Sequence, residues 1–171
     1  MAGSLVQIDK EIITTNTASV SLTGIDSDNV YMVVVSDVYF DSNDDMKIRF
    51  TVSGSADDSS NYDQSHKAMY ADLGFGNTGV QNGSNIDTNQ GTGTTGNNPI
   101  NLIMYLYNFN TSNLYSYVQY ENAHRNTSQS RFGYFAGGGV LKEQQTTDGV
   151  HFYPGSGNNF ANGQFVMYKV V

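Results

Sequence analysis

An acidic cluster is the first group of side chains in this sequence that could do chemistry, as a candidate metal site. Asp41-Ser42-Asn43-Asp44-Asp45 reproduces the opening D-x-N-x-D of an EF-hand calcium loop. Such a loop requires glycine at its sixth position and a bidentate glutamate at its twelfth, but this chain has Met46 and Val52 there. An EF-hand is therefore excluded. Two alternatives stay open, a solvated acidic hairpin, which we favour, and a looser Ca²⁺ site shared with other carboxylates, namely Asp26, Asp28, Asp57 and Asp58.

The histidines and glutamates do not form a recognisable catalytic or metal-binding set. His66, His124 and His151 stand alone, without H-x-H or H-E-x-x-H spacing, and no G-x-S-x-G motif supplies a serine nucleophile. Glutamate occurs only at positions 11, 121 and 143, so an acid and base pair for glycoside hydrolysis would have to come from aspartates in turns. The chain has no cysteine. We therefore predict a protein that is not an enzyme and has no metal ion or cofactor.

Two glycine-rich stretches match the dinucleotide-binding pattern G-x-G-x-x-G, at residues 74–79 and 91–96. In a nucleotide-binding fold this pattern must open a helix whose N-terminus faces the pyrophosphate. No helical periodicity follows either match. Two matches within one glycine-rich segment indicate that composition alone produces the pattern.

The charge balance excludes other classes of partner. Eight basic residues stand against sixteen acidic ones, for a formal net charge of −8, and the basic residues are scattered singly. A row of phosphates could not be neutralised by this arrangement, so we expect no nucleic acid partner. The N-terminus lacks the features of a signal peptide, and no apolar run is long enough to span a bilayer. We expect a protein that is made in the cytoplasm and has no membrane partner.

The hydrophobic pattern predicts an all-β protein. Short apolar or aromatic runs, each bounded by Gly, Asn, Asp or Ser, recur along the chain without helical periodicity. The length of 171 residues suits a single domain, residues 1–171. We predict about ten antiparallel strands in a β-sandwich with jelly-roll topology, and an immunoglobulin-like sandwich or a partly closed barrel as alternatives. The expected strands are residues 5–13, 19–22, 30–40, 47–53, 66–73, 100–109, 114–122, 131–141, 150–153 and 163–170.

Two of the expected strands, residues 30–35 and 102–107, are apolar on both faces. A strand with one buried and one wet face alternates between apolar and polar residues, so the second face of these two strands is expected to be covered. A loop of the same chain or another subunit could cover it. The residues predicted to form a subunit interface are Tyr31, Val33, Val35, Tyr105 and Tyr107.

One segment, residues 74–99, differs from the rest. It holds seven Gly, six Asn and five Thr, with few apolar residues. We expect a long polar loop that acts as a contact arm, because compact domains seldom carry so long a loop unless it is functional. The residues predicted to make its contacts are Phe75, Asn77, Val80, Asn82 and Ile86.

Several short segments of the sequence resemble a family of small virion proteins from marine tailed bacteriophages. They are residues 5–12 (LVQIDKEI), 19–27 (SVSLTGIDS), 106–110 (LYNFN), 137–141 (GGGVL), 148–152 (DGVHF), 156–158 (SGN) and 163–168 (GQFVMY). These segments are strand and turn signatures, and they are spread over nearly the whole chain. The resemblance implies a β-sandwich component of the virion and identifies no catalytic residue.

Taken together, these features lead us to expect a phage virion structural protein. The leading hypothesis is a capsid decoration, or cement, protein that binds the major capsid protein on the outer surface of the head as a homotrimer. The rival hypothesis is a tail-fibre or receptor-binding module that contacts host surface glycan. The twelve tyrosines would suit either role, as subunit contacts or as rings for sugar stacking.

Overall fold

The computed structural model describes residues 3–72, 74–89, 98–126 and 130–171, and its described elements are all β-strands. Thirteen strands are present: β1 (Leu5–Ile13), β2 (Val20–Thr23), β3 (Tyr31–Phe40), β4 (Met46–Val52), β5 (Ser55–Ala56), β6 (Tyr62–Tyr70), β7 (Gly74–Gly83), β8 (Ile86–Asp87), β9 (Ile100–Tyr107), β10 (Ser116–Asn126), β11 (Arg131–Leu141), β12 (Gly149–Pro154) and β13 (Phe160–Val170). The predicted all-β class is confirmed.

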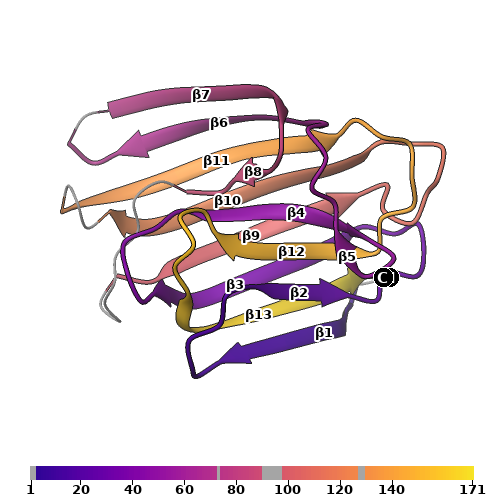
Figure 1. The fold of residues 1–171 in the computed structure, drawn as a ribbon, viewed down its shortest axis with the longest axis horizontal. Helices are drawn as coiled ribbons and strands as arrows, with labels where there is room; N and C mark the ends of the chain where they lie inside the picture. The colour runs from indigo at the N-terminus through magenta and orange to yellow at the C-terminus, as the bar shows by residue number, and fades with distance from the viewer. Residues whose placement is uncertain (1–2, 73, 90–97, 127–129) are drawn as a thin grey trace.

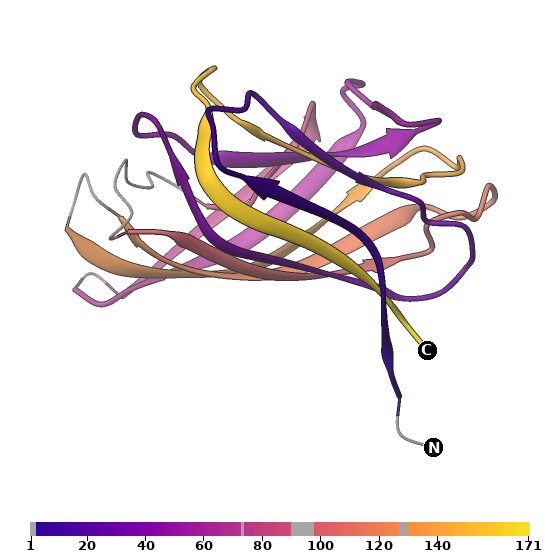
Figure 2. The ribbon, with the colours of Figure 1, turned by 90° about the horizontal axis from the view of Figure 1, so that it is seen from below.

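The strands form two antiparallel sheets that pack face to face as a sandwich (Figures 1 and 2). The larger sheet has eight strands in the order β1-β13-β3-β9-β10-β11-β6-β7. The smaller sheet has the order β2-β12-β4-β5, and β8 also pairs with β4. Figure 2 shows the two sheets as separate layers, and Ser4 lies beside Val171, with which it exchanges two backbone hydrogen bonds.

Early strands of the chain pair with late ones, as the predicted jelly-roll topology requires. β1 pairs with β13, β2 with β12, β3 with β9 and β4 with β8, which is the pattern of a long hairpin rolled into two sheets. Four further strands, β10, β11, β6 and β7, extend the larger sheet beyond β9. This extension gives the larger sheet a broad side turned away from the smaller one.

The core lies between the two sheets and is rich in aromatic rings. The Phe50 ring lies 4.7 Å from that of Phe109 and 5.7 Å from that of Tyr62. Tyr62 is fully buried, and its hydroxyl accepts a hydrogen bond from the Phe50 backbone N–H at 3.0 Å and donates one to the Asp57 carbonyl. Burial raises the pKa of Tyr62, so this ring stays neutral. Each such ring stabilises the fold by about 1.5–3 kcal/mol through burial.

A β-bulge shapes β3 near its C-terminal end. Asp37 has a positive φ of 55°, and the pairing register shifts between Val35 and Val38. Gly163 of β13 has φ +138°, and a Cβ atom there would lie 2.2 Å from Val38 Cγ2. Only glycine fits this position, because both its backbone angle and the close approach of β3 exclude a side chain.

The prediction of a loop over residues 74–99 is wrong for residues 74–83 and 86–87, which form strands. Residues 74–83 form β7, which pairs with β6, and Ile86–Asp87 forms β8. The chain beyond β8 is then tied to β4, because the Thr88 N–H donates to the Met46 carbonyl and the Asn89 side chain accepts from the Met46 N–H. Residues 90–97, including the second G-x-G-x-x-G match, lie outside the described residues. β5, β7 and β8 account for the difference between about ten strands and thirteen.

Candidate functional site

The outer face of the larger sheet, the side turned away from the smaller sheet, carries an unusual number of apolar side chains. Along β9 every second residue is buried in the core, while Asn101, Ile103 and Tyr105 point outward and are exposed. Ile103 is 47% exposed and Tyr105 is 38% exposed. The strand alternation that builds the core thus also places apolar residues on its opposite side.

Neighbouring strands continue this apolar surface. Tyr168 of β13 pairs with Met32 of β3, and Met32 pairs with Tyr105 of β9. In the next row, Val34 of β3 pairs with Ile103. We call the five residues Met32, Val34, Ile103, Tyr105 and Tyr168 the outer-face patch. Cross-strand partners lie close together, so the patch is contiguous.

Polar groups border the patch on β10. Gln119 pairs with Tyr105 and Glu121 pairs with Ile103, and both are exposed. The hydroxyl of Tyr134 is hydrogen-bonded to the Glu121 carboxylate, which raises the pKa of Tyr134. An apolar centre with a polar border is the usual composition of a protein-binding surface.

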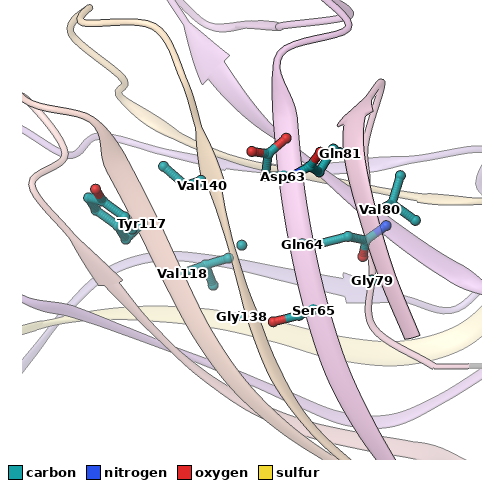
Figure 3. Close-up of a pocket in the computed structure, with 11 residues that line it drawn as sticks. Asp63, Gln64, Ser65, Gly79, Val80, Gln81, Tyr117, Val118, Gly138 and Val140 are labelled. Atoms are coloured by element: carbon teal, nitrogen blue, oxygen red, sulfur yellow. The ribbon is translucent and has the colours of Figure 1, made fainter. Parts of the chain in front are cut away.

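The outer face also has hollows, of which two bear on the argument. The larger, with a volume of 530 Å³, crosses β10, β11, β6 and β7 at a point where β11 has glycine (Figure 3). Figure 3 shows Tyr117 on one side of Gly138 and Ser65 on the other. A Cβ atom at Gly138 would lie 2.6 Å from the Val118 carbonyl oxygen, so glycine both permits the close packing of β10 and β11 and leaves the hollow open. The smaller, 320 Å³, lies between Ile103 and Tyr134.

The outer side of the smaller sheet has the opposite character. Its residues include Ser21, Lys47, Arg49, His151 and Tyr153, and we call this surface the polar face. The Arg49 guanidinium lies 5.0 Å from the centre of the Tyr153 ring and its Nε donates to the Ser84 carbonyl, while Lys47 pairs with Asp87 at 3.5 Å. These polar and charged groups thus have hydrogen-bond, ion-pair or ring partners, as expected of a surface that faces water.

The predicted subunit-interface residues separate into two groups. Tyr31, Val33 and Val35 are wrong as surface residues, because the structure places them on the inner side of β3 with exposures of 0%, 0% and 1%. Tyr105 is exposed and Tyr107 is half-buried on β9. The prediction missed Met32 and Val34, the alternate residues of β3, whose side chains point to the outer face. Both faces of β3 are apolar in sequence, so the pattern alone could not show which one is inside.

The predicted contact residues of segment 74–99 also fall into two groups, exposed and buried. Phe75, Asn77, Val80 and Asn82 lie on β7 and are exposed, Phe75 by 71%. Ile86 was predicted as an apolar contact and is wrong in that role, because it is fully buried beneath Gly139 of β11. Its side chain fills space in the core instead of meeting a partner.

The acidic cluster is used for internal hydrogen bonds. Asp41 accepts hydrogen bonds from the backbone N–H and side chain of Asn159, which lower its pKa. Asp44 accepts from the Ser156 N–H at 2.9 Å and from the Asn158 side chain. Within the described ranges, no three His, Asp or Glu side chains are grouped so that they could hold a metal ion.

The three histidines lie in different environments. His66 and His124 face the core on either side of the Phe135 ring, with centroid distances of 5.3 and 5.2 Å. His151 lies on the polar face, where its Nδ1 and the Ser21 hydroxyl are 2.8 Å apart. Sequence reasoning missed this Ser21–His151 pair, because 130 positions separate the two residues and only the pairing of β2 with β12 joins them.

Comparison with protein-family models, with curated proteins and with solved structures finds no match to this chain. The described residues contain no helix long and apolar enough to cross a membrane.

Proposed function

We propose that the protein is a non-enzymatic structural component of a phage virion, a capsid decoration protein that docks through its outer-face patch. The short sequence segments that resemble small virion proteins of marine tailed phages support the virion role. The contrast between the two outer surfaces of the sandwich supports the docking surface. The partner in this proposal is the major capsid protein on the outside of the head, and the bound form is a homo-oligomer.

The observation that carries the docking proposal is the exposed patch at the centre of the larger sheet. Ile103 and Tyr105, 47% and 38% exposed, adjoin Val34, Met32 and Tyr168 in continuous cross-strand rows. Single exposed apolar residues are common on soluble proteins, but a contiguous apolar patch rimmed by polar groups marks an interaction surface. The smaller sheet, with its mutually paired polar groups, serves as the solvent-facing surface of the bound protein.

The overall charge also suits attachment to a protein surface. The formal net charge of −8 opposes binding to nucleic acid inside the head and favours solubility of the free subunit. Docking through an apolar patch does not require a charged partner.

Copy number in the particle tests this proposal. Quantitative mass spectrometry of purified virions would compare this protein with the major capsid protein. Hundreds of copies per particle are the expected result for a decoration protein, whereas a handful of copies would place it on the tail, and complete absence from virions would overturn the structural role.

A receptor-binding role is the second candidate, and the larger hollow is the observation that favours it. Tyr117 lies on its rim, 43% exposed, with Asp63, Ser65 and Gln81 also lining it. An exposed aromatic ring beside carboxylate and amide groups is suited to stacking on a sugar and to hydrogen bonding with its hydroxyls. Binding of the wild-type protein to host surface polysaccharide, abolished by Tyr117→Ala, would favour this role over decoration.

A further inference from the structure

Among the strands that the structure describes, β7 is the open edge of the larger sheet. It is the last strand in the sheet order and pairs with β6 on one side only. Figure 1 shows it along the border of the molecule. In an edge strand every second N–H and C=O group points away from its neighbour, so β7 offers backbone groups for pairing with a further strand.

The other edges of the sandwich carry the features that prevent such pairing. β1, at the opposite edge of the larger sheet, contains Asp9, Lys10 and Glu11 and has a bulge between Gln7 and Asp9. In the smaller sheet, β2 has four residues and β5 and β8 have two each. Charges, bulges and short length are the known protections of edge strands.

β7 has none of these protections along most of its length. It is ten residues long, GFGNTGVQNG, with no charged residue and no proline. Its only register shift lies near its C-terminal end, where Tyr62 and Gln64 of β6 face it. Phe75 and Val80 are exposed by 71% and 37%. Glycine at four positions leaves little side-chain cover, and glycine within a strand often marks the close approach of another backbone.

We infer that β7 is a self-association site, at which two copies of this chain pair their β7 strands antiparallel about a twofold axis perpendicular to the sheet. A twofold contact uses the same surface on both copies, and an uncharged strand meets its own copy without like-charge repulsion. An axis at Asn77 places each Phe75 opposite Gly79 of the other copy, where no side chain hinders the ring. An aromatic ring over an edge glycine is a favourable cross-strand pair.

This contact is independent of the outer-face patch, but it has a consequence for docking. A twofold axis perpendicular to the sheet keeps both outer faces on the same side of the dimer. If the proposed function holds, the two patches can engage one surface together, and the second contact benefits from a high effective concentration. The inference gives a dimer, in contrast to the homotrimer expected from the resemblance.

The test uses the mass of the full chain in solution together with paired charge variants. Sedimentation equilibrium of the wild type should show a reversible dimer. Asn77→Lys and Asn77→Glu should each raise the dissociation constant by about tenfold or more, because two like charges then face one another at the axis. An equal mixture of the two variants should recover the dimer. Val6→Lys, on the exposed part of β1, is the matched control and should leave the mass unchanged.

Hydrogen exchange of the unmodified protein supplies a measurement that does not depend on how the variants fold. Amides of residues 74–83 should exchange more slowly as protein concentration rises, and amides of residues 5–13 should not change. A monomer at all concentrations, a trimer without a dimer, a dimer insensitive to both charge variants, or exchange in β7 that is independent of concentration would each overturn the inference.

Discussion

Val34 on β3 pairs directly with Ile103 on β9, and both side chains point away from the core. Their neighbours in the same strands, Val33 and Leu102, are buried between the sheets. The neighbouring strands β3 and β9 of the larger sheet are therefore apolar on both sides, and only one side is covered by the smaller sheet. This relationship is the structural basis of the docking proposal.

The aromatic core should dominate stability. Phe50→Ala removes a ring that contacts both Tyr62 and Phe109, so we expect a loss of about 3–5 kcal/mol in the free energy of unfolding. The measurement is urea unfolding followed by circular dichroism. Phe132→Ala is the control, because that ring is 53% exposed, and it should change stability by no more than about 0.5 kcal/mol. Equal losses for the two variants would contradict the assignment of the core.

Gly139 should not tolerate a side chain. A Cβ atom there would lie 2.6 Å from Ile86 Cδ1 and 3.0 Å from the Asp63 carbonyl oxygen, so Gly139→Ala should cost about 1–3 kcal/mol through overpacking. Gly76→Ala is the matched control, because its nearest neighbour, Ala68 Cβ, would be 3.7 Å away. The two melting temperatures would be compared. Similar values for both variants would show that Ile86 does not pack beneath β11.

Stability should fall as the pH is lowered below about 6.5. His66 is 6% exposed, both its ring nitrogens lack a hydrogen-bond partner among the described residues, and burial lowers its pKa. The unfolded chain therefore binds a proton at a pH where folded His66 does not, and acid favours unfolding. Stability contributed in this way is complete above the unfolded pKa and is lost as the pH falls toward the folded pKa.

His66→Leu tests this assignment by urea unfolding at several pH values between 7.5 and 5. The variant should show a smaller loss of stability on acidification than the wild type. His151→Leu is measured alongside, because burial and the charge of Arg49 lower the pKa of His151 as well. Its loss of stability on acidification separates the contribution of His151 from that of His66. An unchanged pH dependence in His66→Leu would mean that the pKa of His66 is the same in the folded and the unfolded protein, which would contradict the assignment.

The architecture was largely predictable from sequence, because strand alternation is a local pattern. Ile48, Phe50 and the polar residues between them define the two faces of β4 without any tertiary information. The pairing of β1 with β13 and of β2 with β12 depends on contacts between distant parts of the chain, so the sequence could not order the strands and left the immunoglobulin-like sandwich and the barrel open beside the jelly roll.

The candidate site was less predictable. Gly74–Gly83 has the composition of a loop, and it becomes a strand because β6 supplies a complete hydrogen-bonding partner. In β3, apolar residues alternate with apolar residues, so Tyr31 and Met32 could each have been inside. Only the position of the smaller sheet determines that Met32 belongs to the surface.

The most direct test of the docking proposal is the incorporation of purified variants into capsids that lack the native protein. Tyr105→Glu places a charge in the outer-face patch, and Tyr153→Glu makes the same substitution on the polar face, beside Arg49 and Lys47. The number of copies bound per capsid would be measured for both variants and the wild type. We predict that Tyr105→Glu lowers incorporation by about tenfold or more while Tyr153→Glu binds as the wild type does. Normal incorporation of a folded Tyr105→Glu variant would contradict docking through the outer-face patch.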